Sequence, residues 1–426
     1  MFVRNDVTVD ARVLKEAGSL RDAGHTVTIV GTTRPDAPHR IERETHAGLE
    51  IVRVPLPRWR RWWRWLRAPS RLWSMLRRRS IRAADGARMD ALDWLAMWRF
   101  GTLGWARAAA RAAGPADVVH GHDLTGLPAA VEARRRASSG AGRRPRLVYD
   151  SHELYLESGA VLGRPAWAVG WLERRERAWT ADADALVTVN HALAGILAPR
   201  LRIEDVVVVH NCPPRPAKPQ PAAGELVRTA AGIPAGSPVV ISHGGFRPGR
   251  GLRETAEAIL EPGLEAVHLA LLGFGPLRGE LLALAAEPRF EGRVHVLDPV
   301  APDEVVAWVA SADVACLPIQ ATNRSYELAT PNKLFEALSA GVPIVASDLP
   351  GIRAIVAGDP DGPLGELCDP DDPAAIGAAL RRILELPPGE RRTLGERCLR
   401  AARERWNWES ESAKLVALYG SFEGRS

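Results

Sequence analysis

Short apolar runs alternate with amphipathic segments along most of the chain, and this pattern predicts parallel β-sheets covered by α-helices. Residues 10–24 have apolar positions at helical spacing, with Asp10 as a candidate cap and Gly24 as a stop. The predicted strands are continuous and rich in β-branched residues, as expected for strands buried on both faces. In the first half of the chain these strands are residues 25–32, 49–56, 116–123, 146–153, 183–190 and 205–211.

A proline-rich stretch, residues 212–224, interrupts the alternation and is typical of an interdomain linker. Because 426 residues are too many for one typical core, we expect two doubly wound α/β domains. Ligands of such domains bind at the carboxyl ends of the strands. After the linker, the predicted strands are residues 239–245, 267–275, 293–299, 312–318 and 342–348. The domains are expected at residues 1–211 and 225–405, with a C-terminal helix at 406–426 that crosses back to the first domain.

Residues 58–82 carry ten arginines, five tryptophans and no acidic residue, whereas the whole chain has a net charge of only +5. The positive charge is therefore local, which argues against a nucleic-acid-binding protein. We expect a basic, tryptophan-rich insertion, residues 58–105, that binds an anionic membrane surface. Its expected contact residues are Trp59, Arg60, Trp62, Trp63 and Arg64. In the alternative, the tryptophans pack on the domain and the arginines are solvated.

The four cysteines form no CxxC pair and no metal-ligand spacing with histidine, which favours a reducing compartment without structural zinc. The first residues do not resemble a signal peptide, and no run of about 20 apolar residues is present. We therefore expect a cytoplasmic protein, peripheral at the inner face of the plasma membrane.

The segment 326–351 is the most specific in the chain. Thr330 and Pro331 predict a helix start, where backbone amides and the helix dipole favour an anion. The amides expected at this position are those of Asn332, Lys333 and Leu334. Lys333 adds a cation, and Glu336 lies one turn further along, where its carboxylate can accept two hydrogen bonds from a vicinal diol such as ribose.

On these residues the chain resembles family 4 of the GT-B glycosyltransferases, a large group of retaining enzymes that use nucleotide sugars. The similarity is strongest over residues 242–351 and continues, weaker but collinear, from Asp10 to the C-terminal segment. It implies the GT-B fold, in which two Rossmann-like domains face each other across a cleft. It also implies a nucleotide-sugar donor and no requirement for a metal or another cofactor.

The resemblance assigns the ribose contact to Glu336, the second of two family glutamates seven residues apart. The first falls on Leu328, which is not acidic, and the adjacent Glu327 is a candidate replacement that requires a rearranged loop. The diphosphate-binding cations correspond to Arg250 and, because Gly245 occupies the other position, to Arg247. Without the resemblance, this segment is also compatible with a glycine-rich turn and solvated arginines.

Further donor contacts are implied at two turns that follow predicted strands. Gly244 belongs to the first, and Gly273 and Gly275 form a glycine–proline turn typical of the family. The loop at Pro299 corresponds to one whose backbone contacts the nucleotide base. Such recognition leaves no side-chain signature, so the base cannot be inferred.

In the first domain, His122 corresponds to a family histidine that reaches the donor sugar and phosphate. Asp150, His152 and Glu153 end the next strand and are suited to the acceptor side. Two alternatives remain open: His120 and His122 as one core and one surface residue, and the second cluster as a capped strand end. Metal binding by the two histidines is less favoured because no third ligand is apparent.

Family members begin with a buried strand and a glycine-bearing loop before the first helix, whereas only residues 1–9 precede it here. We expect either that Phe2–Arg4 forms a stub of this strand or that the start codon lies upstream.

These features predict a retaining glycosyltransferase that transfers a sugar to a lipid-linked or saccharide acceptor in cell-envelope polysaccharide biosynthesis. Arg250, Lys333, Glu327 and His122 are the expected catalytic residues. The rival hypotheses are a GT-B sugar-nucleotide epimerase and a catalytically inactive, membrane-bound scaffold.

Overall fold

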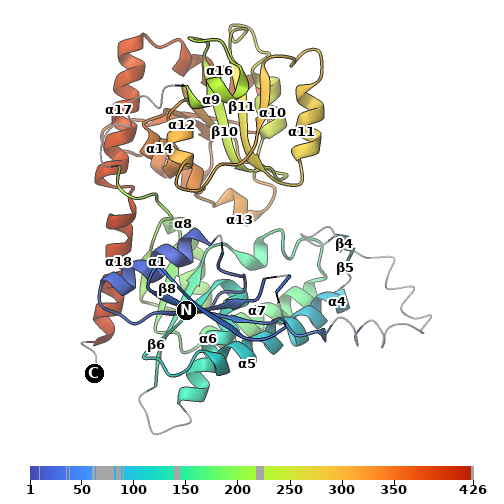
Figure 1. Ribbon diagram of the computed structural model, residues 1–426, viewed down its shortest axis with the longest axis vertical. Coiled ribbons are helices and arrows are strands. Elements are labelled where there is room, and N and C mark those ends of the chain that lie inside the picture. Colours follow the sequence, from blue (N-terminus) through green and yellow to red (C-terminus); the bar gives the residue numbers. More distant parts are fainter. Residues whose placement is uncertain are drawn as a thin grey trace, which may run out of the picture. The chain divides into compact units, whose positions relative to one another are not determined.

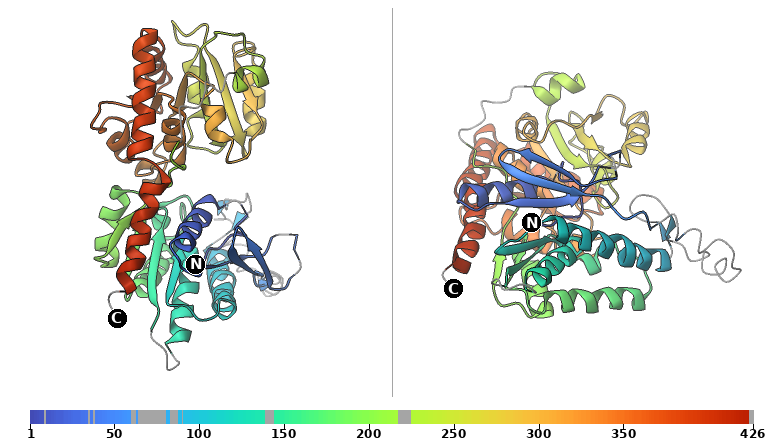
Figure 2. Two further views of the ribbon diagram at one scale, coloured as in Figure 1. Left: turned by 60° about the vertical axis from the view of Figure 1, so that its left-hand side comes forward. Right: turned by 60° about the horizontal axis from the view of Figure 1, so that its bottom comes forward.

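The chain divides into two α/β units, each with a largely parallel sheet and helices on both faces (Figures 1 and 2). The first unit comprises Met1–Val209 and Ser412–Ser426, and the second comprises His210–Glu411. The computed structural model describes residues 1–8, 10–34, 36–37, 39–59, 63, 81–82, 88–89, 91–138, 144–216 and 225–423.

The first unit contains these elements: α1 (Ala11–Asp22), β1 (Thr28–Thr32), β2 (Glu42–His46), β3 (Leu49–Val54), β4 (Ile81–Arg82), β5 (Arg88–Met89), α4 (Ala91–Ala96), η1 (Met97–Thr102), α5 (Leu103–Ala112), β6 (Val118–His122), α6 (Asp123–Ala137), β7 (Arg146–Ser151), η2 (Tyr155–Glu157), α7 (Ala166–Thr180), β8 (Ala185–Thr188), α8 (His191–Leu201) and β9 (Val206–Val208). The last helix, α18 (Trp408–Glu423), begins in the second unit and belongs to the first from Ser412 onward, as predicted for a helix that crosses back.

Phe2 joins two groups of strands in the first unit. One group has the order β1-β3-β2, and the other has the parallel order β6-β7-β8-β9. Phe2 forms parallel bridges to both Val30 of β1 and Gly121 of β6. Its amide donates to the His120 carbonyl at 2.7 Å, and its own carbonyl accepts from the His122 amide at 2.9 Å. Phe2 therefore lies in the sheet as the predicted strand stub does, and the two groups form a continuous surface.

The second unit contains these elements: α9 (Leu226–Ala231), β10 (Val239–Gly245), α10 (Leu252–Ala258), β11 (His268–Phe274), α11 (Arg278–Ala285), β12 (Val294–Leu297), α12 (Val305–Val309), β13 (Val314–Leu317), α13 (Arg324–Glu327), α14 (Asn332–Ala340), β14 (Ile344–Ser347), α15 (Pro350–Val356), β15 (Gly365–Cys368), α16 (Pro373–Leu384) and α17 (Pro388–Glu404). The strands pair in parallel in the order β12-β11-β10-β13-β14-β15. The chain reverses its direction of winding between β10 and β13, where ligands of doubly wound sheets bind.

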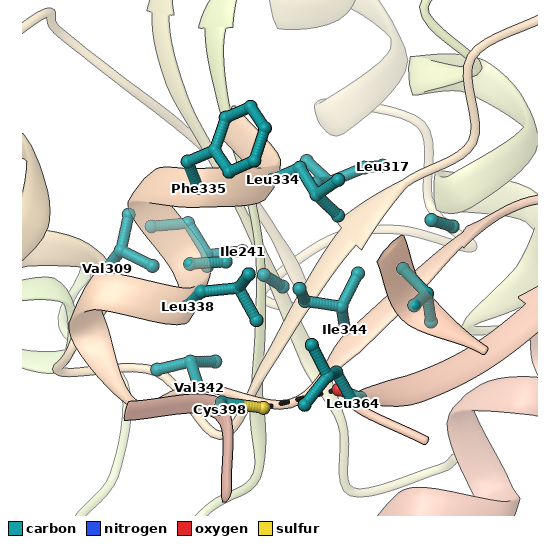
Figure 3. Close-up of a cluster of buried hydrophobic side chains, with 14 of the residues drawn as sticks. Ile241, Val309, Leu317, Leu334, Phe335, Leu338, Val342, Ile344, Leu364 and Cys398 are labelled. Atoms are coloured by element: carbon teal, nitrogen blue, oxygen red, sulfur yellow. Dashed lines mark hydrogen bonds between the residues drawn. The ribbon is translucent and has the colours of Figure 1, made fainter. Parts of the chain in front are cut away.

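Both faces of this sheet are buried, because alternate residues of each strand enter different cores. Ile241 packs with the helices α12, α14 and α17, whereas its neighbour Val240 packs with α10, α11 and α16. Figure 3 shows Leu334, Phe335 and Leu338 of α14 in the first of these cores. Burial of one such side chain contributes about 1.5–3 kcal/mol relative to its exposure. The cores therefore fix how α14 is turned about its axis, and hence which of its residues remain accessible.

The expected linker is only partly described, because residues 217–224 lie outside the described residues. Cys212 is buried in the core of the second unit. The Pro213 carbonyl accepts a hydrogen bond from the Trp408 amide at 2.8 Å. The first residues of this proline-rich stretch therefore pack on the second unit.

Candidate active site

Glycines at the carboxyl ends of β10 and β11 bring backbone and Lys333 into close contact. Gly244 has a φ of +95° and Gly273 a φ of +156°, values that side-chain-bearing residues rarely adopt. A Cβ atom on Gly273 would lie 1.9 Å from the Gly244 carbonyl oxygen, and one on Gly244 would lie 2.8 Å from Lys333 Cε. At Gly275, a Cβ atom would lie 2.4 Å from the Phe246 carbonyl oxygen. Only glycine fits at these positions, and ligand binding by these turns stays a prediction.

Helix α14 begins close to the predicted position but offers fewer amides. Its first residue is Asn332, and Pro331 is the N-cap rather than the first turn of the helix. The Leu334 amide donates to the Pro331 carbonyl at 3.0 Å, so the expectation that Leu334 binds an anion is corrected. The amides of Asn332 and Lys333 remain as candidate donors at the positive end of the helix. Thr330 lies half-buried just before the N-cap.

Lys333 lies in an environment that disfavours its charge. Burial, and then repulsion by Arg250, lower the pKa of Lys333 to about 8, although Glu336 acts in the opposite direction. An opposite charge nearby would restore the charged form. The surroundings of Lys333 therefore suit an anionic ligand.

Arg250 and Arg247 follow the same strand end but differ in their contacts. The guanidinium carbon of Arg250 lies 4.8 Å from the centre of the Tyr326 ring, a cation–π contact that holds the arginine in place. Arg247 is exposed, and its Nε lies 3.7 Å from the position of a Cβ on Gly245. Both cations thus follow the end of β10, and the side chain of Arg250 is held by its contact with Tyr326.

Glu336 is paired with a residue that sequence reasoning missed. Oε2 of Glu336 lies 2.8 Å from Nε2 of His243, which is on β10 one residue before Gly244. The His243 side chain is 2% exposed and that of Glu336 is 27% exposed. The only sequence signal was a polar residue near the end of a strand otherwise buried on both faces.

The remaining predicted donor residues differ in their exposure. Leu328 is buried in the protein, and Glu327 forms an exposed ion pair with Arg324 at 2.7 Å. Pro299 is exposed after β12. Phe274, between the two glycines of the second turn, is 61% exposed at the end of β11.

In the first unit, a buried charge network underlies the carboxyl ends of β6 and β7. Arg12 of α1 contacts both carboxylate oxygens of Asp150 at 3.2 Å and Oε1 of Glu16 at 2.9 Å. It also donates to the Val209 carbonyl at 2.8 Å. All three ionisable side chains are at most 5% exposed. Burial raises the pKa of Glu16 to about 8. At Asp150 burial acts in the same direction, but the charges of Arg12 and His152 outweigh it and hold the pKa well below its usual value.

Three histidines surround Asp150, and their pKa values are shifted in different directions. Nε2 of His152 lies 3.2 Å from Asp150 Oδ2, and its Nδ1 lies 3.2 Å from Asp123 Oδ2. Burial opposes its charge, but these two carboxylates raise the pKa of His152 well above its ordinary value. Burial lowers the pKa of His120 to about 3 and also lowers that of His122. The surroundings of His152 therefore favour its charged form, whereas those of His120 and His122 favour the neutral form.

The burial of this network corrects two expectations about substrate contact. The side chains of His122 and Asp150 are both 0% exposed, so neither presents an atom to a substrate here. The accessible groups are instead His152, 22% exposed, and Asp123, 32% exposed. Asp123 was not predicted. It begins α6 with a φ of +53° and accepts the His152 amide on Oδ1 at 3.0 Å.

Four of these buried side chains have metal-ligand chemistry. Ligand atoms of Glu16, His120, His122 and Asp150 lie within 4.8 Å of one another. The Arg12 guanidinium, however, contacts the acidic groups of both Glu16 and Asp150, so a cation of the protein itself already lies beside them. His120 is also tied to α18, because its Nδ1 lies 2.8 Å from the Tyr419 hydroxyl.

Glu153 completes the predicted acceptor-side group. It is half-buried after β7. Burial, and then the nearby charge of Asp123, raise the pKa of Glu153 to about 7. A carboxyl group that titrates near neutral pH is suited to proton transfer.

The expected membrane contact is corrected at Trp59, which is only 7% exposed. A Cβ atom on Gly101 would lie 2.8 Å from Trp59 Nε1, so the indole packs against η1. Trp63 is half-buried and donates to Asp93 at 2.8 Å. These two tryptophans follow the packing alternative, whereas Arg60, Trp62 and Arg64 lie outside the described residues. No helix in the described part of the chain has the length and apolar character needed to cross a membrane.

Comparison with known proteins agrees with this division into two halves. Residues 8–212 match the family described as glycosyl transferase 4-like domain, and residues 237–386 match glycosyl transferases group 1. A D-inositol 3-phosphate glycosyltransferase of Xylanimonas cellulosilytica is 31% identical over 334 residues, 75% of each chain. An MMP alpha-(1→4)-mannosyltransferase of Mycolicibacterium hassiacum is 35% identical over 136 residues, 32% of this chain and 31% of that one.

Solved structures show the same fold at low sequence identity. A sucrose-phosphate synthase from Thermosynechococcus elongatus has a TM-score of 0.71 and 18% identity, over 100% of this chain and 96% of the other. A UDP-forming α,α-trehalose-phosphate synthase from Burkholderia vietnamiensis has a TM-score of 0.68 and 16% identity, over 98% of each chain. The chain therefore belongs to the GT-B glycosyltransferases of the family 4 type and is a glycosyl-transferring enzyme.

Proposed function

We propose that this enzyme is a retaining glycosyltransferase that moves a sugar from a nucleoside diphosphate to a hydroxyl of a membrane-associated glycolipid or polysaccharide precursor. The observation that carries the proposal is the set of groups around Gly244 in the second unit. Lys333 lies against this glycine, Arg250 is close enough to lower the pKa of Lys333, and α14 begins beside them. This is the arrangement expected for binding a diphosphate.

In the proposed reaction, the bond between the sugar C1 and the phosphate oxygen breaks as the acceptor oxygen bonds to C1 on the same face. The diphosphate leaves with the bonding electron pair and takes the acceptor proton. Lys333, Arg250 and the first amides of α14 stabilise the negative charge that develops on it. Removing one such preorganised donor typically costs about 3 kcal/mol of transition-state stabilisation.

The first unit supplies the acceptor side. His152 replaces His122 as the histidine that reaches a substrate, because part of its ring is accessible. Asp123 and Glu153 offer carboxylates for acceptor hydroxyls, and the raised pKa of Glu153 suits exchange of a proton at neutral pH. The related D-inositol 3-phosphate glycosyltransferases support an acceptor rich in hydroxyl groups.

For membrane contact, Leu162 and Trp167 replace Trp59. They are 63% and 56% exposed, and Arg164 lies between them in the sequence. An exposed tryptophan and a neighbouring arginine favour the interface of an anionic membrane. Sedimentation with phosphatidylglycerol vesicles is expected to fall when both residues are changed to serine. Equal sedimentation of the double variant would exclude this surface, and equal sedimentation with phosphatidylcholine vesicles would exclude the charge contribution.

Nucleotide binding tests the proposal as a whole. Thermal unfolding is measured with UDP, GDP, dTDP and their sugar conjugates. A ligand at a hundred times its Kd adds about 2.7 kcal/mol to the free energy of unfolding. One nucleotide is expected to protect the wild type and Lys414→Ala, which alters an exposed lysine, but not Lys333→Ala. Protection of Lys333→Ala equal to that of the wild type, or no protection of the wild type, would contradict the proposal. Donor conversion without an acceptor would instead support an epimerase.

A further inference from the structure

Lys333 and Glu336 are both half-buried residues of α14, three residues apart. Their neighbours Leu334, Phe335 and Leu338 point into the core (Figure 3). Lysine and glutamate at this spacing commonly form an ion pair on a helix. Within the described residues, these two form none, and the Glu336 carboxylate hydrogen-bonds only to His243.

His243 is suited to hold this carboxylate because of its burial and its free ring nitrogen. The ring is 2% exposed, and Nδ1 has no hydrogen-bond partner among the described residues. A protonated Nδ1 would be a buried donor without an acceptor, which is costly. This geometry favours the tautomer with its proton on Nε2, which donates to Glu336 Oε2 at 2.8 Å.

This bond determines what Glu336 can do. One carboxylate oxygen is engaged by a rigid, buried donor, so the side chain is held in one orientation and the other oxygen is left for a ligand. The same bond keeps the carboxylate from pairing with Lys333, and the lysine remains available for an anion. A hydrogen bond to a charged group contributes enough to hold such an arrangement.

We propose that His243 is a positioning residue that orients Glu336 for the ribose diol and so sets the preference for ribonucleotides over 2′-deoxyribonucleotides. This inference depends on the proposed function, since it requires a nucleoside diphosphate bound beside α14. His243 itself touches no ligand in this role. Its effect is transmitted through the Glu336 carboxylate.

The test compares ribo- and 2′-deoxyribonucleoside diphosphates by isothermal titration calorimetry. UDP with dUDP, and GDP with dGDP, are titrated into the full-length wild type, His243→Leu, His243→Gln, Glu336→Ala and the double variant His243→Leu/Glu336→Ala. The wild type is expected to prefer the ribonucleotide about tenfold, the size of one hydrogen bond to a charged group. His243→Leu and Glu336→Ala are expected to bring the ratio to within about twofold, and the double variant to lower it no further. His243→Gln retains an Nε2 donor and is expected to restore the preference.

The control is His295→Leu, which alters a half-buried histidine of β12 that stacks on His268. It is expected to keep the wild-type ratio. If circular dichroism shows that His243→Leu is folded and it binds the ribonucleotide and the 2′-deoxyribonucleotide more weakly by the same factor, the role of His243 is structural and the inference is overturned. A preserved preference in His243→Leu also overturns it. If the wild type binds no nucleoside diphosphate, the proposed function fails and the inference fails with it, a result distinct from binding with an unchanged ratio.

Discussion

Raising the pH above 8 is expected to weaken diphosphate binding by removing the charge of Lys333. Burial and the repulsion of Arg250 lower the pKa of Lys333 to about 8. At pH 7 most molecules carry the ammonium ion, whereas at pH 9 only about one in eleven free molecules does. A bound diphosphate favours the charged lysine and raises its pKa again. Binding above pH 8 therefore takes up a proton, and affinity falls as the pH rises through this value.

The size of the effect follows from the fraction of charged lysine. If the complex requires the ammonium ion, affinity at pH 9 is about tenfold lower than at pH 7, or about 1.4 kcal/mol. Isothermal titration calorimetry at pH 7, 8 and 9, in buffers of different ionisation enthalpy, measures both the affinity and the proton uptake. The expected uptake at pH 9 is about 0.9 proton for each ligand bound.

Two variants at the same position separate Lys333 from other titrating groups, including those of the nucleotide. Lys333→Arg remains charged throughout this range and is expected to flatten the profile. Lys333→Met is expected to bind weakly at every pH without the tenfold decline. The reasoning would be refuted by a wild-type affinity that stays constant from pH 7 to 9, or by a Lys333→Met variant that keeps the decline.

Three further predictions concern stability. Burial raises the pKa of Glu16 to about 8 from an ordinary 4.5, so the contribution of Glu16 to stability declines as the pH rises from 4.5 and is lost once it has passed 8. Glu16→Gln is therefore expected to melt at a higher temperature than the wild type at pH 8.5, and at no higher temperature at pH 5. Gly273→Ala is expected to lower the free energy of unfolding by more than about 2 kcal/mol and to abolish protection by nucleotide, because its Cβ meets the Gly244 carbonyl. In the same urea titration, Gly279→Ala on α11, where a Cβ has open space, is expected to raise the free energy of unfolding by about 0.5–1 kcal/mol. Leu338→Ala is expected to lose about 2–5 kcal/mol by urea denaturation, and a loss below 1 kcal/mol would show that the core of the second unit refills the space.

The fold was predictable because buried parallel strands leave continuous apolar runs in the sequence. The predicted strand at 239–245 coincides with β10, and that at 267–275 contains β11. The proximity of Lys333 and Glu336 was also predictable from the sequence, since residues one turn apart on a helix are local neighbours. The start of α14 was placed two residues early, because a proline before a helix can be a cap or part of the first turn.

What could not be predicted depends on contacts between distant segments. His243 and Glu336 are 93 residues apart, and no local pattern relates them. His122 and Asp150 end strands as predicted, but their burial is decided by Arg12 of α1 and by the histidines around them. Trp59 was expected at a membrane but packs against Gly101. Helical spacing of apolar residues cannot distinguish an indole that contacts lipid from one that packs on the protein.

The left-handed backbone of Asp123 is a local strain that the contacts of its carboxylate must offset. Aspartate adopts its φ of +53° at a cost of about 1 kcal/mol, and both of its carboxylate oxygens are directed to His152. Glycine would relieve that strain but would remove the carboxylate. A hydrogen bond to a charged group contributes about 1.5–3 kcal/mol, so Asp123→Gly is expected to lower stability although it relieves the backbone. A variant selected for heat resistance is therefore expected to keep this aspartate.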